Sequence, residues 1–234
     1  MSKMTVLLAH GAWADGSSWR KVIDRLGEVG VRVAAVQMPL TSLADDAAAV
    51  RRWIDRATGP IVLVGHSYGG AAITVAAAGQ DKVKALVYVA ALAPAEGEKV
   101  EELLHREPPH PNTPALGPDD NGLIWMSEQG FTDAMGLEST PLERTQMFAT
   151  QTPISVKCLG EAMGQPAWKE KPSWYLLAKN DRMISPATQL FMAKRMKAQI
   201  ESVESDHTPL VSHPEIVTRV IMAAVGWSAT STLP

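Results

Sequence analysis

The run Gly65-His66-Ser67-Tyr68-Gly69-Gly70 decides the fold of this 234-residue chain. It follows the short apolar stretch 61–64 and precedes an alanine-rich stretch that is typical of a helix. A serine at the tip of such a strand–turn–helix has a strained backbone, and its neighbours must be small. The N-terminus of the following helix favours negative charge that develops beside Ser67. The pattern therefore predicts a serine nucleophile on a sharp turn.

Short apolar stretches alternate with longer helical patterns along the rest of the chain. Most strand candidates are apolar on both faces, which is typical of parallel strands covered by helices on both sides. The alternation predicts an α/β fold, with a mostly parallel, doubly wound sheet of about six strands. The strand candidates are residues 5–9, 31–36, 61–64, 85–89, 174–178 and 200–203. The helical stretches are residues 18–29, 43–57, 68–78, 187–197 and 214–227.

One long segment interrupts this alternation. From residue 95 to 172 no convincing strand is seen, prolines cluster early, and helical patterns recur at 141–150 and 154–163. A segment of this length is too long for a plain loop. We therefore predict a helical cap inserted at residues 95–172, and a core formed by residues 1–94 and 173–234.

Composition and charge exclude several classes of partner. Hydrophobic residues make up 46% of the chain and charged residues 20%, a balance that argues against disorder. The net charge of −3, without a basic patch, argues against nucleic acid. No apolar run approaches the ~20 residues that span a bilayer, and the N-terminal stretch is too short for a secretory signal. The single cysteine, Cys158, excludes an internal disulfide. We expect a single-domain, cytoplasmic protein that binds no membrane.

Landmarks in a fixed order along the chain carry a family resemblance. The landmarks are His10-Gly11-Ala12-Trp13, Gly65-His66-Ser67-Tyr68-Gly69, Asn180-Asp181 and Asp206-His207. On them, the chain resembles the α/β-hydrolase superfamily, and more narrowly the group of plant methylesterases, hydroxynitrile lyases and their bacterial esterase relatives. The resemblance spans nearly the whole chain, but the cap is too variable for residues to be carried across it.

The resemblance implies a serine–histidine–acid triad. A serine hydroxyl needs a base to accept its proton, and the base needs an acid that fixes its tautomer. His207 follows the last predicted strand, and Asp181 follows the strand at 174–178. With Ser67 they reproduce the chain order of nucleophile, acid and histidine that is typical of the fold.

The remaining titratable candidates are assigned other roles. His10 is expected to orient a loop, and His66 is the variable position of the turn. Solvated positions are expected for His105 and His110, and a capping or surface position for His213. Asp206 is expected to be a loop or capping group, and Asp45 and Asp46 are expected on an exposed helix face. Because some relatives place the acid after the strand at 85–89, the alternative acids are Glu96 and Glu98.

An oxyanion hole and an apolar pocket complete the expected site. The resemblance maps the two backbone N–H donors to Ala12, in the first loop, and to Tyr68, after the nucleophile. No residue spacing indicates a metal site or a phosphate-binding loop, so no cofactor is expected. The candidate substrate-binding residues are Gly11, Trp13, Trp125, Met126, Phe131, Phe148 and Thr208.

These observations favour a carboxylic ester hydrolase that acts through an acyl-serine intermediate on a small-molecule ester. A hydroxynitrile lyase is disfavoured. Lyases in one branch of the resembling group carry Thr after the first-loop histidine and Lys after the catalytic histidine, where this chain has Gly11 and Thr208. A ligand receptor on the same scaffold stays open, because fold alone does not determine function. A homodimer is likewise left open.

Overall fold

The computed structural model describes residues 4–231. Its centre is a six-stranded sheet in which all neighbouring strands are parallel, in the order β2-β1-β3-β4-β7-β8. This confirms the predicted α/β fold, and each strand begins and ends within two residues of its predicted position. The strands are β1 (Thr5–Ala9), β2 (Arg32–Val36), β3 (Ile61–His66), β4 (Val83–Val89), β7 (Ser173–Ala178) and β8 (Gln199–Val203).

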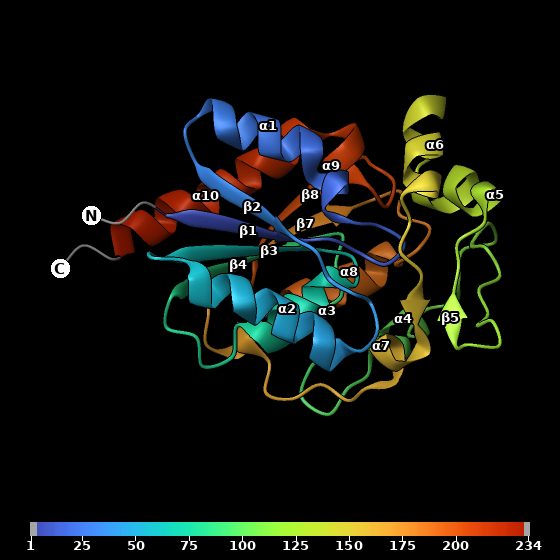
Figure 1. Cartoon of the computed structure of the whole chain (residues 1–234), viewed down its shortest axis with the longest axis horizontal. Helices are drawn as coiled ribbons and strands as arrows, with labels where there is room; N and C mark the ends of the chain where they lie inside the picture. Colours follow the sequence, from blue (N-terminus) through green and yellow to red (C-terminus); the bar gives the residue numbers. More distant parts are fainter. Residues whose placement is uncertain (1–3, 232–234) are drawn as a thin grey trace.

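Helices cover both faces of the sheet (Figure 1). Successive side chains of a strand point to opposite faces, so Val62 and Val64 pack in one core and Ile61 and Leu63 in the other. The first core is closed by η1 (Gly16–Trp19), α1 (Arg20–Glu28), α9 (Pro209–Ser212) and α10 (Pro214–Ser231). The second is closed by α2 (Leu43–Arg56), α3 (Gly69–Ala76) and α8 (Pro186–Arg195). No helix within residues 4–231 is both long and apolar enough to cross a membrane.

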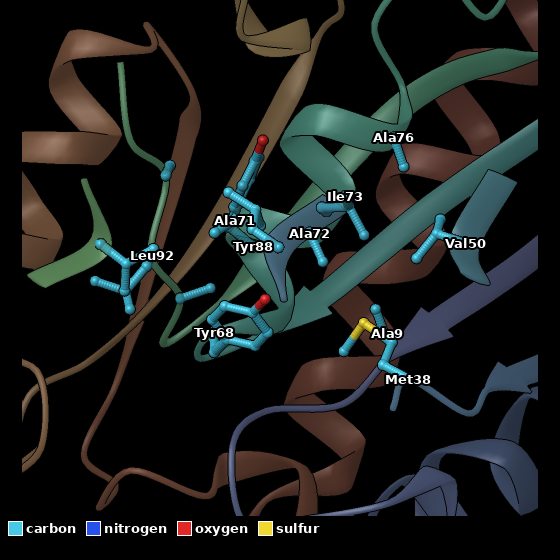
Figure 2. Close-up of a cluster of buried hydrophobic side chains, with 14 of the residues drawn as sticks. Ala9, Met38, Val50, Tyr68, Ala71, Ala72, Ile73, Ala76, Tyr88 and Leu92 are labelled. Atoms are coloured by element: carbon cyan, nitrogen blue, oxygen red, sulfur yellow. The ribbon is translucent and has the colours of Figure 1, made fainter. Parts of the chain in front are cut away.

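Small side chains let α3 lie close to the sheet. Figure 2 shows Ala71, Ala72 and Ile73 of α3 in one apolar cluster with Val50 and Tyr88. Each of these side chains is fully buried. Burial of an aliphatic side chain of the size of Ile73 contributes about 1.5–3 kcal/mol. The buried cluster therefore fixes the position of α3 and of the turn that precedes it.

Most of the segment between β4 and β7 lies at the end of the sheet away from the chain termini (Figure 1). It contains two short antiparallel strands, which the sequence analysis did not predict. A two-residue strand shows no periodicity, and its partner lies some thirty residues away, so residues 154–163 resemble a single helix in sequence. The elements are α4 (Val100–Leu104), β5 (Leu123–Ile124), α5 (Glu128–Gly130), the π-helical turn η2 (Phe131–Met135), α6 (Pro141–Ala149), β6 (Ile154–Ser155), α7 (Val156–Gly160) and η3 (Ala167–Lys169).

The proposed division into core and cap refers to this segment, which we call the cap (residues 95–172). The expected core ranges, 1–94 and 173–234, include residues 1–3 and 232–234, which lie outside the described residues. The division itself stays a prediction.

Candidate active site

Ser67 lies between the end of β3 and the start of α3, at the carboxyl edge of the sheet. Its backbone is left-handed, with φ of 52°, a conformation that non-glycine residues keep only where the surroundings hold it. Two amides do so: Gly70 and Leu92 both donate to the Ser67 carbonyl, each at 3.0 Å. The strained turn expected from the sequence is therefore present.

Two glycines make this turn sterically feasible. A Cβ atom on Gly65 would lie 2.7 Å from the backbone of Gly69 and Gly70. One on Gly69 would lie 2.4 Å from the His10 carbonyl oxygen. Both distances are too short for any side chain, so each position requires glycine.

The structure brings Ser67, His207 and Asp181 together from three different loops. The Ser67 Oγ lies 2.8 Å from His207 Nε2, and His207 Nδ1 lies 2.7 Å from Asp181 Oδ2. Because Asp181 accepts from Nδ1–H, Nε2 is left to accept the serine proton. Both side chains are buried, with His207 and Asp181 only 1% and 4% exposed. This arrangement can activate a serine for attack on a carbonyl carbon.

Asp181 is held by three donors besides His207. The Met183 and Ile184 amides donate to Oδ1 at 2.7 and 2.9 Å, and Gln189 Nε2 donates to Oδ2 at 2.7 Å. Gln189 is fully buried on α8. Gln189 is not predicted from the sequence, because a polar residue on a helix is ordinarily exposed and nothing near it in sequence indicates an acid partner.

Two further histidines hold the backbone of the site. The Met38 amide donates to His10 Nε2 at 3.0 Å, so His10 Nδ1–H donates to the Gly11 carbonyl at 2.9 Å. His10 thereby braces the loop that carries Ala12, as expected. His66 Nε2–H donates to the His207 carbonyl at 2.8 Å, a contact that was not predicted.

The alternative acids lie elsewhere. Glu98 makes an ion pair with Arg195 at 2.8 Å, and Glu96 pairs with Lys169 at 3.0 Å.

Asp206 is buried, and it accepts from the Thr208 amide at 2.8 Å and from the Glu138 amide at 2.9 Å. The Asp206 side chain therefore ties the histidine loop to the cap.

The two expected oxyanion donors are the Ala12 amide, in the loop after β1, and the Tyr68 amide, directly after Ser67. Within residues 4–231, neither the Ala12 nor the Tyr68 amide donates to a backbone carbonyl. Tyr68 immediately precedes α3, where amides lack helical acceptors. Both amides are thus available to a bound oxygen atom.

Asp46 corrects an expectation from the sequence. It was assigned to an exposed helix face, but it is fully buried, unlike its exposed neighbour Asp45. The Tyr68 hydroxyl donates to Asp46 Oδ2 at 2.7 Å, and the Leu40 amide donates to Oδ1 at 2.8 Å. Burial raises the pKa of Asp46, against the lowering effect of these hydrogen bonds. These partners compensate for the burial of the Asp46 carboxyl group, and Asp46 in turn anchors the Tyr68 side chain.

The candidate pocket residues fall into two groups. Met126 and Phe131 are buried, whereas Phe148 is 39% exposed and packs edge-on against Phe131. Trp125 is 51% exposed, with its indole directed to Asp119.

Thr208 does not present a free hydroxyl to a substrate. It is buried, and its Oγ1 lies 3.1 Å from each of two acceptors, the Met135 carbonyl oxygen and Asp206 Oδ1. Among the described residues, no group of three His, Cys, Asp or Glu side chains is placed to hold a metal ion.

Comparison with known proteins places the chain in a family. Residues 6–220 match the alpha/beta hydrolase family. The chain belongs to this family. Among its relatives, the pyrethroid hydrolase of Sphingobium wenxiniae is 27% identical, with 94% of this chain and 87% of the relative covered. Methylesterase 2 of Arabidopsis thaliana is 23% identical, with 94% and 95% covered.

Solved structures of alpha/beta hydrolases share the fold. The crystal structure of a pyrethroid hydrolase from Sphingobium faniae matches with a TM-score of 0.81 and 24% identity, over 98% of this chain and 100% of that chain. The resemblance to plant methylesterases and bacterial esterases is thus confirmed. The family and its named members support an enzyme of the carboxylic ester hydrolase class.

Proposed function

We propose that this protein is a serine hydrolase that cleaves carboxylic esters of small to medium apolar substrates through an acyl-serine intermediate. The observation that carries the proposal is the continuous buried chain of contacts from Ser67 through His207 to Asp181. Relatives named pyrethroid hydrolase and methylesterase support an ester as the substrate. A cytoplasmic location belongs to the proposal as an expectation from the sequence, and a homodimer stays open.

The proposed reaction has two halves. His207 Nε2 takes the Ser67 proton as Oγ attacks the ester carbonyl, and Asp181 stabilises the imidazolium that forms. The Ala12 and Tyr68 amides donate to the oxygen on which negative charge develops. His207 then protonates the departing alcohol, and the acyl group stays on Ser67. In the second half, His207 deprotonates a water molecule that attacks the acyl-serine, which releases the acid and restores the serine.

The site does not accommodate the residue pattern of the lyase branch considered above. A Cβ atom on Gly11 would lie 2.8 Å from the Ser67 Cβ and 3.1 Å from His66 Nδ1, so a threonine at this position would displace the nucleophile. The Thr208 side chain is engaged by Asp206 and Met135, and a lysine there would lose both bonds. Changing both residues toward the lyase pattern is therefore expected to abolish activity rather than convert it.

A hydrolysis panel tests the proposal. We expect turnover of p-nitrophenyl esters with acyl chains from C2 to C12, and the preferred chain length would measure the acyl pocket. A fluorophosphonate probe should add to the protein once, on Ser67, as read by peptide mass spectrometry. Ser67→Ala should abolish both signals. Ser205→Ala is the control, because Ser205 is equally buried in the His207 loop but contacts Ser212 instead of the triad.

Other outcomes would replace the proposal. A folded protein that neither turns over esters nor reacts with the probe would favour the receptor. Mandelonitrile cleavage above its spontaneous rate, lost in Ser67→Ala, would favour the lyase. Labelling at another residue would remove Ser67 as the nucleophile.

A further inference from the structure

Trp13 has an unusual backbone for a bulky residue. It follows Ala12 directly, in the loop after β1, and its φ is 54°. A side chain of this size adopts the left-handed region at an energetic cost and keeps it only where other contacts hold it. Because Trp13 directly follows a proposed oxyanion donor, the contacts that hold its backbone also affect the position of that donor.

The indole of Trp13 is bonded to the cap. Its Nε1–H donates to the Ile124 carbonyl at 2.9 Å, across 111 positions of sequence. Trp13 is 9% and Ile124 6% exposed, so water does not compete effectively for this bond. Ile124 lies in β5, which pairs with β6, and the Ser155 amide of β6 donates to the Leu40 carbonyl of the core. The bond therefore links the oxyanion loop to an anchored part of the cap.

Another part of the boundary between this loop and the cap is a groove with an ion pair across it. A groove of about 270 Å³ runs between residues 14–21 and α6. The ion pair between Lys21 and Glu143 crosses it, with the lysine side chain 38% exposed. Partly solvated pairs of this kind contribute little to holding a geometry. The buried Trp13 bond is the better candidate for fixing the loop.

We infer that Trp13 is a positioning residue that sets the Ala12 amide for the oxyanion and does so only while the cap is seated on the core. This inference rests on the proposed ester hydrolysis. The Ala12 amide lies between two anchors: His10 holds the Gly11 carbonyl before it, and the Trp13 indole holds the chain after it. Without the second anchor the strained Trp13 backbone can relax, which moves the donor away from the oxygen.

The inference predicts a specific kinetic signature. Full negative charge on the oxygen develops in the transition state, so a displaced donor lowers kcat and leaves KM nearly unchanged. Loss of one oxyanion donor outright typically costs ~10²–10³ in rate, and we expect a loosened donor to cost about tenfold. A Trp13 that merely lined the pocket would instead raise KM.

Trp13→Phe tests this, because it keeps a buried ring and removes the N–H. Trp168→Phe is the matched control: Trp168 is 8% exposed, and its indole also donates to a backbone carbonyl, that of Pro94, at 3.2 Å. For the folded variants we expect kcat to fall about tenfold in Trp13→Phe and to stay within twofold of the parent in Trp168→Phe. Equal effects of the two changes, or a raised KM at unchanged kcat in Trp13→Phe, would overturn the inference.

A trifluoromethyl ketone provides a second readout. Ser67 Oγ adds to its carbonyl carbon, and His207 takes the serine proton. The carbonyl oxygen becomes an oxyanion that accepts hydrogen bonds from the two amides, so the affinity of the inhibitor measures their position. Its Ki should rise in Trp13→Phe by the same factor as kcat/KM falls, and an unchanged Ki would contradict the role.

If Trp13→Phe does not fold, replacing the indole by a benzothiophene through an unnatural amino acid keeps the shape and removes the N–H, with the same expected shifts. Parent protein that hydrolyses no ester would refute the proposed function, whereas active parent with an unaffected Trp13→Phe would refute the inference alone.

Discussion

His66 occupies the variable position of the serine turn, yet it is fully engaged in the site. Its Nε2–H donates to the His207 carbonyl, and the two rings lie 5.0 Å apart between centroids. Within residues 4–231 its Nδ1 has no hydrogen-bond partner. Burial, followed by the nearby His207, lowers the pKa of His66 to about 3. The ring is therefore neutral wherever the protein is folded near neutral pH.

This shift predicts how stability depends on pH. In the unfolded chain a histidine takes up a proton near pH 6.5, whereas folded His66 does so only near pH 3. Between these values the unfolded state binds the extra proton, so the free energy of unfolding falls as the pH drops below about 6.5. Each pH unit in that window costs up to ~1.4 kcal/mol. Urea unfolding at pH 7, 6 and 5 measures this slope.

His66→Gln isolates the contribution of His66, because the glutamine amide can still donate to the His207 carbonyl but does not titrate. We expect the parent to lose about 2 kcal/mol more than His66→Gln between pH 7 and 5. Burial also lowers the pKa of His10, which changes the free energy of unfolding in the same direction as His66. Burial raises the pKa of Asp46 and of Asp206, and these two groups change the free energy of unfolding in the opposite direction. These three groups are present in both proteins and cancel in the difference. Parallel pH curves would contradict the prediction.

At the scale of elements, α8 supplies a clamp for the catalytic acid. The Gln189 carboxamide donates to Asp181 and to the Ile184 carbonyl, and it accepts from the Ala178 amide at the end of β7. One helix residue thus joins the strand end, the loop and the acid. The start of α8 is well determined by Ser185 as N-cap and Pro186 in the first turn, so Gln189 is carried on a rigid element.

Gln189→Leu is expected to lower kcat about tenfold and to leave KM unchanged. Asp181 keeps its two amide donors in this variant. The decrease in kcat should therefore be much smaller than the ~10³–10⁴-fold decrease expected for Asp181→Asn, which removes the acid function. Steady-state kinetics on a p-nitrophenyl ester checks both values. Thr188→Val, an equally buried neighbour on α8, should have little effect on kcat. A Gln189→Leu variant as active as the parent would show that the two amides suffice.

At the scale of the whole molecule, Arg195 connects the end of α8 to the start of the cap. Its guanidinium donates to both oxygens of Glu98 at 3.1 and 2.8 Å and to the Ala93 carbonyl at 2.8 Å. It also lies 4.9 Å from the ring centroid of Phe191. A planar guanidinium can satisfy these partners together, and an ammonium cannot.

Arg195→Lys should therefore destabilise the protein by about 1–2 kcal/mol, which lowers Tm by roughly 3–6 °C in a chain of this size. Scanning calorimetry measures the shift. Arg219→Lys is the matched control, since Arg219 pairs with Glu201 at an exposed site where the loss should be small. At temperatures where Arg195→Lys is folded, its kcat/KM should equal that of the parent. A lower kcat/KM would mean that Glu98 influences the triad after all.

Features that depend on neighbours in the chain could be predicted from the sequence. The strand, the glycines and the helix around Ser67 all lie within residues 61–76, and their steric demands are local. The alternation of elements likewise predicted the parallel sheet, because parallel strands need crossover helices. The order of Ser67, Asp181 and His207 indicated the triad through the resemblance, not through any local pattern.

Only the tertiary structure decided which polar residues are buried and what they hold. Asp46 resembles its exposed neighbour Asp45 in sequence, but Tyr68, 22 positions away, lies against it. Gln189 meets Asp181 because α8 packs back on β7, and Trp13 meets Ile124 because the cap folds over the first loop. Such contacts depend on how elements pack in space, and helical or strand periodicity records only which face of an element is apolar.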